Sequence, residues 1–178
     1  LHNYTITHKM LSLNKEFFLQ DAVSLAPKLL GKTIVRTFND GTVSRYTITE
    51  TEAYYGEEDL ACHACKGRTT RTEIMYADGG HIYVYLIYGM YWMLNIVSGP
   101  KDHPEAVLIR GLNEVYGPGR VGRILELNKS FYGEDLISST RIRIEDGPGI
   151  ESFSCYPRIG IDYAGEPWKN KAWRFTIK

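Results

Sequence analysis

The sequence predicts an α+β fold in which an antiparallel sheet is flanked by a few short helices. Its 178 residues suit a single compact domain with one hydrophobic core. Segments rich in β-branched and aromatic residues outnumber helical segments and follow one another directly, without long helices between them. Consecutive strands joined by short turns pair antiparallel, so the pattern disfavours a doubly wound parallel sheet.

The expected strands are the segments in which β-branched and aromatic residues dominate: 33–36, 43–54, 81–88, 91–97, 106–110 and 140–145, with two more within 157–178. The turn Asn39-Asp40-Gly41 joins the first two strands into a hairpin. Two short helices are also expected. Ser24 caps the first, which ends at Gly31, and Pro118 opens the second, which ends near Asn128.

Composition excludes several classes of protein. No apolar run reaches the roughly 18 residues of a membrane-spanning helix, and the first residues lack the pattern of a signal peptide. Three cysteines are too few for a disulfide framework. We therefore expect a cytoplasmic protein without a membrane partner. Because 21 Lys and Arg balance 21 Asp and Glu, bulk charge does not favour nucleic acid, although basic groups within 66–71, 120–123 and 169–178 form local patches.

Two carboxylates and a tyrosine share one face of the strand expected over 43–54. The period of two places Ile48, Glu50, Glu52 and Tyr54 together on that face. On an edge strand this face is a solvated surface. In a cleft, a buried carboxylate needs a partner, because an unpaired buried charge costs several kcal/mol.

Arg110 is the candidate partner, since alternation places it on the same face as Ala106 and Leu108 at the inner end of an apolar strand. One interpretation is a structural salt bridge. The other is that Arg110 holds a catalytic carboxylate ionised, so that this carboxylate acts as a general base and removes a proton from water.

Aromatic residues crowd the hairpin expected over 81–97. Alternation places Tyr83 and Tyr85 on one face, which forms either a hydrated strand surface or a flat aromatic wall. Tyr88 falls at the turn with Met90, so a protruding hairpin with an exposed aromatic tip is expected, and such a tip favours stacking or intercalation. Asn95 on the return strand either sets hydrogen-bonding selectivity or is a satisfied core amide.

No metal site or cofactor is expected. Cys62, His63 and Cys65 have the short spacing of metal ligands, but the remaining histidines and Cys155 offer no second ligand pair for a structural zinc. The better functional interpretation of His63 is that it points into the aromatic cleft.

Taken in order, these residues resemble the alkyladenine, or 3-methyladenine (3-methylpurine), DNA glycosylase family. The resemblance is carried by segments with matching order and spacing: Glu50–Tyr54, His63, Tyr83–Tyr91, Asn95, Val107–Arg110 and Arg158–Gly160. It extends from about Phe17 to Lys178, and the short extensions at both ends are similar to those of bacterial members.

The resemblance implies one glycosylase domain over 1–178, with 1–13 as a loose N-terminal extension, and a curved antiparallel sheet. It also implies hydrolysis of the bond between deoxyribose and an alkylated or deaminated purine of the 3-methyladenine, hypoxanthine and ethenoadenine class. The partner is then double-stranded DNA containing damaged purines. The protein is expected to act as a monomer, without a cofactor, in the cytoplasm or, in a bacterium, at the nucleoid.

The resemblance further implies roles for single residues. Glu52 is the general base and Arg110 positions the attacking water. The pocket for the flipped base is formed by five residues: Tyr54, His63, Tyr85, Asn95 and Ile159. Tyr88 enters the minor groove and fills the vacated space, with Met90 beside it. Attack by water and not by a lysine implies a monofunctional enzyme, which leaves an abasic site without cutting the strand.

Two other functions fit part of the pattern. A non-catalytic nucleic-acid-binding domain explains the tyrosines as a stacking platform, but not the placement of Glu52 and Arg110. A small carbohydrate or nucleoside hydrolase that uses Glu50 and Glu52 as an acid–base pair is disfavoured, because carboxylates two residues apart on a strand do not flank a substrate.

Overall fold

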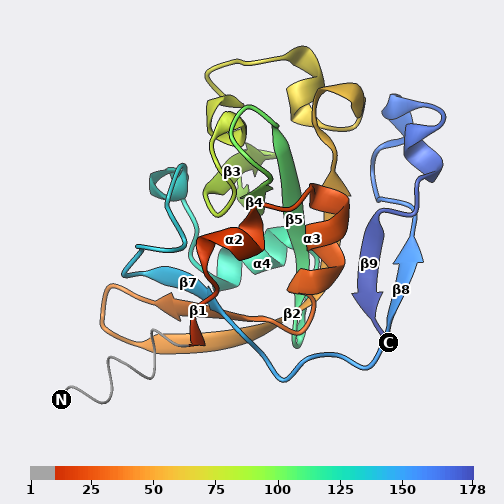
Figure 1. Cartoon of the computed structure of the whole chain (residues 1–178). Helices are drawn as coiled ribbons and strands as arrows, with labels where there is room; N and C mark the ends of the chain where they lie inside the picture. The colour runs from red at the N-terminus through yellow and green to blue at the C-terminus, as the bar shows by residue number, and fades with distance from the viewer. Residues whose placement is uncertain (1–10) are drawn as a thin grey trace.

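In the computed structural model, which describes residues 11–178, a curved antiparallel sheet forms the centre of the molecule (Figure 1). Its main path runs β3-β4-β5-β2-β1-β7, β6 pairs with β5, and β9 joins β2 to β8. The strands are β1 (Thr33–Thr37), β2 (Val43–Tyr54), β3 (Ile82–Ile87), β4 (Tyr91–Ser98), β5 (Glu105–Leu112), β6 (Val115–Tyr116), β7 (Ile142–Glu145), β8 (Phe153–Tyr156) and β9 (Arg174–Ile177). The prediction of one compact domain with a curved antiparallel sheet and few helices is confirmed.

The helices of the described residues are short: α2 (Lys15–Phe18), α3 (Ala22–Leu29) and α4 (Pro118–Ile124). The loops contain single 3₁₀ turns at Gly56–Glu58, His63–Lys66, Glu73–Tyr76, Lys129–Phe131, Asp162–Ala164 and Trp168–Asn170. Between residues 11 and 178, no helix has the length and apolar character needed to cross a membrane.

Helix α3 covers one face of the sheet and forms the main core with it. Its buried Leu25 and Leu29 belong to the same hydrophobic cluster as Ile48 and Ala53 of β2. The hydroxyl of Thr51 is also buried on this face and donates to the Ala26 carbonyl of α3 at 2.8 Å. The opposite face of β2 is therefore left for polar residues.

Two irregularities interrupt the pairing of β2 with β5. The register pairs Ile48 with Leu112, Glu50 with Gly111 and Thr51 with Ile109. One residue on each strand therefore has no partner in the register and forms a bulge. The prediction that Ile48 shares the face of Glu52 is wrong, because the extra residue reverses the alternation and Ile48 enters the core. On β5, the residue without a register partner is Arg110 itself.

The β3–β4 hairpin ends in a tight turn. The amide of Met90 donates to the Ile87 carbonyl at 3.1 Å, and Tyr88 and Gly89 have φ values of 52° and 65°. Positive φ at both central positions is the sign that a type I′ turn requires. The turn leaves Tyr88 89% exposed and Met90 62% exposed.

Helix α4 packs closely against β4 because its inner positions are glycines. A Cβ atom on Gly122 would lie 1.9 Å from the Trp92 carbonyl oxygen, so only glycine permits this approach. The first residue of α4, Pro118, is thereby placed at the same end of the sheet as the β3–β4 turn, where both Pro118 and Tyr88 line one cavity.

Three local predictions are wrong. Asp21, not Ser24, caps α3; the Asp21 carboxylate accepts the Ser24 amide at 2.9 Å, so the helix starts three residues earlier. The final strands are β8 and β9, and the segment between them consists of loops and 3₁₀ turns, so β8 precedes the expected range. Helix α4 ends before Asn128, which instead caps the following 3₁₀ turn.

Of the N-terminal extension expected over 1–13, residues 1–10 lie outside the described part of the chain. Leu13 donates its amide to the Ile144 carbonyl of β7 at 2.9 Å.

Candidate active site

A cavity of about 430 Å³ opens on the face of the sheet opposite α3, a volume within the range of roughly 300–1,000 Å³ that is usual for small-molecule sites. Strands β2, β3, β4 and β5 form its floor. Its sides come from two loop segments, residues 61–75 and 159–163, which follow β2 and β8 respectively. Both loop segments lie at the upper end of the sheet in Figure 1.

Glu52 lies behind the cavity wall and is fully buried. Its Oε2 accepts a hydrogen bond from the Tyr54 hydroxyl at 2.8 Å, and its Oε1 accepts one from the Ile159 amide at 2.8 Å. Tyr54 and Ile159 both line the cavity. The carboxylate is thus held by two donors that themselves face the space where a ligand would lie.

Arg110 completes the surroundings of this carboxylate from β5. Its Nε lies 3.6 Å from Oε1 of Glu52 and 3.4 Å from Oε1 of Glu50, and the latter carboxylate also pairs with Arg174 at 3.0 Å. The Nε atom is buried and donates no hydrogen bond within residues 11–178. The β5 bulge therefore directs a cation with a free donor beside two carboxylates.

The pKa of Glu52 is raised above the ordinary glutamate value, because burial disfavours the charged form. Arg110, the Ile159 amide, the Tyr54 hydroxyl and Arg158 all oppose this effect. A carboxyl with a raised pKa is a stronger base once ionised, and a general base works best when its pKa approaches the working pH.

Aromatic rings form the walls of the cavity. His63 lies edge-on to Tyr85, with ring centroids 4.6 Å apart, and its Nδ1 lies 2.8 Å from the Tyr83 hydroxyl. The rings of Tyr83 and Tyr85 are tilted against each other with centroids 5.4 Å apart. Tyr54 bounds the same cavity from β2. Such walls offer flat apolar faces to a planar ligand.

These walls are uncharged at neutral pH. Burial raises the pKa of Tyr83 to about 12 and also raises the pKa values of Tyr54 and Tyr85. Burial and the nearby Arg71 lower the pKa of His63 to about 4, so its ring is neutral. The ionised groups at the cavity are therefore confined to the lining arginines, Arg71 and Arg110, and to the carboxylates that lie beside Arg110 behind the wall.

Asn95 lies buried in the cavity wall on β4. Its Nδ2 donates to the Tyr83 carbonyl at 3.2 Å, so the amide is a satisfied hydrogen-bonding group of the hairpin. A satisfied amide and a role in hydrogen-bonding selectivity are compatible for Asn95, because Nδ2 is used within the hairpin and Oδ1 remains available as an acceptor.

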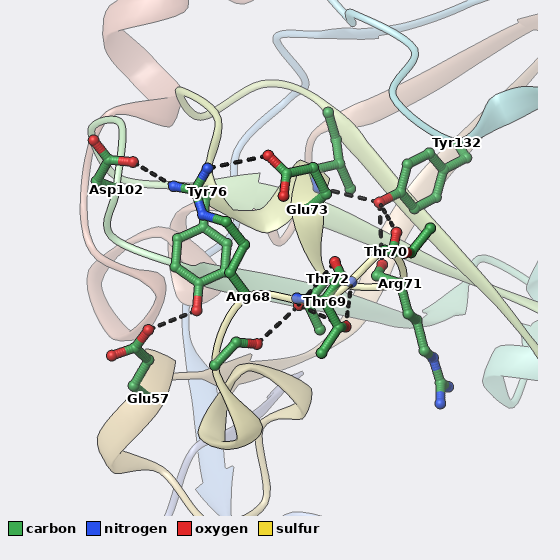
Figure 2. Close-up of polar contacts among 12 residues, drawn as sticks. Glu57, Arg68, Thr69, Thr70, Arg71, Thr72, Glu73, Tyr76, Asp102 and Tyr132 are labelled. Carbon is green, nitrogen blue, oxygen red and sulfur yellow. Dashed lines mark hydrogen bonds and ion pairs between the residues drawn. The ribbon is translucent and has the colours of Figure 1, made fainter.

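Arg71 lines the cavity from a loop that is held by hydrogen bonds to Tyr132 (Figure 2). The Tyr132 hydroxyl lies 3.2 Å and 3.1 Å from the carbonyls of Thr70 and Arg71, to which it donates, and the Ile74 amide donates back to this oxygen at 3.1 Å. The guanidinium of Arg71 points away from this cluster and lies 5.1 Å from the Tyr85 ring centroid.

The neighbouring Arg68 has a different environment, although the sequence groups it with Arg71 in one basic patch. It forms ion pairs with Glu73 at 3.1 Å and Asp102 at 2.6 Å and stacks on Tyr76 (Figure 2). Its charge is neutralised within the protein, so the patch contributes less positive charge to the surface than its sequence indicates.

Sequence reasoning missed a buried ion pair beside the site. Arg158 donates to both oxygens of Asp59, at 2.5 Å and 2.9 Å, and both side chains are fully buried. The two residues are 99 positions apart, and Asp59 is the last of three consecutive acidic residues, a pattern more typical of a solvated surface. Only the Arg158–Gly160 segment of the resemblance pointed to this region.

The other predicted residues lie at the mouth of the cavity or beside it. Ile159 lines the cavity and is half-exposed, and Tyr88 lines its outer edge from the hairpin turn. Met90 is exposed beside Tyr88 and is not part of the lining. Burial raises the pKa of Cys62 to about 12, and no metal-binding cluster of His, Cys, Asp or Glu occurs within residues 11–178.

Comparison with known proteins agrees with this geometry. A protein of Natranaerobius thermophilus is 40% identical over 94% of this chain and 96% of its own length. A protein of Methanocella arvoryzae is 39% identical over 93% of this chain and 92% of its own length. Both carry the name "Putative 3-methyladenine DNA glycosylase". The sequence profile for methylpurine-DNA glycosylase matches residues 16–117 and 113–178. The chain, with its buried carboxylate behind an aromatic cavity, therefore belongs to the methylpurine-DNA glycosylase family.

Proposed function

We propose that this protein is a base-excision DNA glycosylase that flips alkylated or deaminated purines out of duplex DNA and hydrolyses their N-glycosidic bond. The substrates are lesions of the 3-methyladenine, hypoxanthine and ethenoadenine class, and the protein acts as a monomer. The observation that carries the proposal is the buried carboxylate of Glu52, held by Tyr54, Ile159 and Arg110 against an aromatic cavity.

Base flipping begins at the β3–β4 hairpin, which protrudes into the minor groove in this proposal. Tyr88, almost fully exposed at the turn, fills the space that the flipped purine leaves, with Met90 beside it. Flipping costs a few kcal/mol, least for a poorly paired lesion. Stacking of the purine on Tyr54, His63 and Tyr85 offsets this cost.

Hydrolysis then follows from the groups around Glu52. The ionised carboxylate accepts a proton from water as the water attacks the sugar carbon, and the free donor of Arg110 orients this water. The positive charge that develops on the sugar is stabilised by the anionic Glu52. The bond to the purine breaks, and the purine leaves with the bonding electron pair.

The reaction is monofunctional in this proposal. The described residues that line the cavity include no lysine, so the cavity offers no amine to form a covalent link with the sugar. Attack by water leaves an abasic site in an uncut strand.

Lesion choice depends on the shape and polarity of the cavity. The neutral rings of His63, Tyr83 and Tyr85 attract a purine made electron-poor or cationic by alkylation. Asn95 lines the cavity, and we assign it the exclusion of normal guanine through the exocyclic amino group of that base.

DNA is held on both sides of the cavity by a few cations. Arg71 and Arg123 stack on Tyr85 and Tyr91 instead of pairing with a carboxylate of the described chain. Arg123 belongs to α4, whose first residue lines the same cavity as Arg71. We assign both arginines to phosphates that flank the flipped nucleotide.

A non-catalytic nucleic-acid-binding domain remains the alternative that shares the tyrosine wall. It gives no reason for the family membership or for a fully buried carboxylate beside Arg110, because a binding surface gains nothing from a desolvated negative charge.

Replacement of Glu52 by glutamine separates the enzyme from the binder. In Glu52→Gln, we expect release of 3-methyladenine or hypoxanthine from duplex DNA to fall by at least about 100-fold, because the general base is lost. DNA affinity should stay the same. Single-turnover base release and binding to the same duplex are the two measurements. Binding by the parent protein without any base release would contradict the proposal.

The same variant should fold normally. Burial raises the pKa of Glu52 in the folded state, so its ionised form lowers stability at every pH above the unfolded value of about 4.3. The glutamine side chain that replaces it carries no charge, and the free energy of unfolding of the variant should at least equal that of the parent at neutral pH.

The rate of base release should rise with pH in a single step on the acid side of the pH–rate profile. Glu52 acts only when ionised, so the rate falls as the pH drops through its raised pKa, which lies above about 4.3. With its pKa lowered to about 4, His63 adds no step between about pH 6 and 7. The pH–rate profile tests this. A step near pH 6 to 7 that His63→Phe removes would show that the histidine titrates during the reaction.

Removal of the exposed tyrosine tests the proposed intercalation. Tyr88→Ala should slow base release from duplex DNA by roughly 5- to 150-fold, the equivalent of one lost stacking contact. Release from single-stranded DNA should change little, because no base-pair stack has to be filled. Val43→Ala, which alters an exposed apolar residue of the β1–β2 hairpin, is the control. Equal rates for Tyr88→Ala and the parent on duplex would remove Tyr88 from this role.

Salt dependence tests the proposed phosphate contacts. Arg71→Gln and Arg123→Gln should each reduce the slope of log affinity against log salt by about 0.9, the value for one phosphate contact. Lys28→Gln is the matched control, because Lys28 is exposed on α3 across the sheet from the cavity. If all three variants keep the parental slope, the phosphates are bound elsewhere.

A further inference from the structure

The ion pair of Asp59 and Arg158 is unusual because both side chains are fully buried and neither lines the cavity. Removing two charges from water costs several kcal/mol per ion, and excellent geometry is needed to offset this cost. Such a pair is therefore weak evidence for stability alone. The groups that contact the pair indicate instead that it positions other parts of the site.

Asp59 organises the loop that follows β2. Besides Arg158, its Oδ2 accepts the Tyr55 amide at 3.0 Å and its Oδ1 accepts the Ala61 amide at 3.0 Å. Both carboxylate oxygens are thus shared between the loop backbone and the arginine. The loop conformation fixes where the carboxylate lies, and the carboxylate fixes where Arg158 lies.

Arg158 connects this loop to two further segments. It donates to the Ala53 carbonyl of β2 at 3.0 Å and to the Trp168 carbonyl at 3.4 Å. Its guanidinium lies 4.9 Å from the ring centroid of Tyr54, whose hydroxyl bonds Glu52. The arginine thus joins β2 to the loop between β8 and β9.

The residue directly after Arg158 is the one whose amide reaches Glu52. The Ile159 amide donates to Oε1 of Glu52 at 2.8 Å, and the chain then turns away at Gly160, which has a φ of 75°. Since Arg158 is anchored by both Asp59 oxygens, the position of the adjacent peptide group is set by the same anchor.

We propose that Asp59 and Arg158 are a positioning pair, which holds the Ile159 amide on Oε1 of Glu52 and thereby fixes the direction in which this carboxylate faces the cavity. The inference rests on the proposed role of Glu52 as the base. Neither residue touches the substrate; both act through the Ile159 peptide group.

Two variants separate geometry from charge. Arg158→Lys keeps the positive charge but loses the paired contact with Asp59. Replacement of the Ile159 amide by an ester removes only the N–H donor and leaves every side chain unchanged. Arg143→Lys is the matched control, because Arg143 pairs with the buried Glu145 on β7, away from the cavity.

The readouts are the pKa of Glu52 and the rate of base release. The pKa is measured by NMR titration of carbon-13-labelled glutamate, with Glu52→Gln to assign the signal. The charged or titratable groups around Glu52 are Glu50 and Tyr54 on β2, Tyr85 on β3, Arg110 on β5, Arg174 on β9 and Arg158. Arg158→Lys and the ester leave these charges unchanged, so a shift reports the loss of the amide contact.

Both variants should raise the pKa of Glu52, because a hydrogen bond to the ionised form is lost. Both should slow single-turnover release of 3-methyladenine from duplex DNA by roughly 10- to 100-fold, with DNA affinity unchanged. The control should match the parent. If Arg158→Lys fails to fold, Asp59→Asn takes its place as the test of the pair, and the ester still tests the amide contact itself.

An unchanged Glu52 pKa and an unchanged release rate in a folded ester variant would overturn the positioning role. A parent protein that releases no base would instead overturn the proposed function. In that case the NMR titration still tests the pair, because it needs no catalytic activity.

Discussion

Burial of the Glu52 carboxylate is the constraint on which the arrangement of this molecule depends. An ionised carboxylate inside a protein is costly unless partners surround it, and Glu52 is fully buried. Its partners come from separate parts of the chain: Tyr54 on β2, Arg110 on β5 and the Ile159 amide between β8 and β9. The strand order, the bulges and the C-terminal loop are therefore coupled, because a shift of any one of them removes one of the three partners of the charge.

The aromatic rings of the cavity do not require a ligand to adopt one fixed orientation. Its rings are neutral, since burial raises the pKa of Tyr83 and lowers that of His63. Stacking on such rings depends on a flat ligand face and tolerates different substituents, whereas proton transfer to Glu52 requires a fixed geometry. In the proposed reaction, the aromatic rings therefore accept several different lesions, whereas proton transfer requires one position of the reacting water. The rings line the cavity, and Glu52 lies behind another part of its wall.

Local periodicity placed several site residues correctly, and it failed where distant segments meet. Alternation along a strand is enough to put Glu52 and Tyr54 on one face, because each strand carries its own pattern. The same rule misplaced Ile48, since the bulge arises from pairing with β5 and leaves no mark in the sequence of β2. Asp59 and Arg158 have no common pattern at all. Their contact follows from the packing of two loops that are almost a hundred residues apart.

The chain has no net charge, because 21 Lys and Arg balance 21 Asp and Glu, and the structure shows which of its arginines are already paired with carboxylates. Three arginines are engaged by carboxylates of the protein: Arg68 of the predicted basic patch pairs with two acids at the surface, Arg110 lies beside two more, and Arg158 is buried with Asp59. A cation that stays paired with a carboxylate of the protein neutralises no phosphate, so these three arginines add little to non-specific attraction to DNA. In the proposed function, Arg71 and Arg123 supply phosphate contacts, and the further affinity for a lesion comes from contacts made only at a flipped base. A glycosylase that gains its binding energy there spends little time on undamaged duplex.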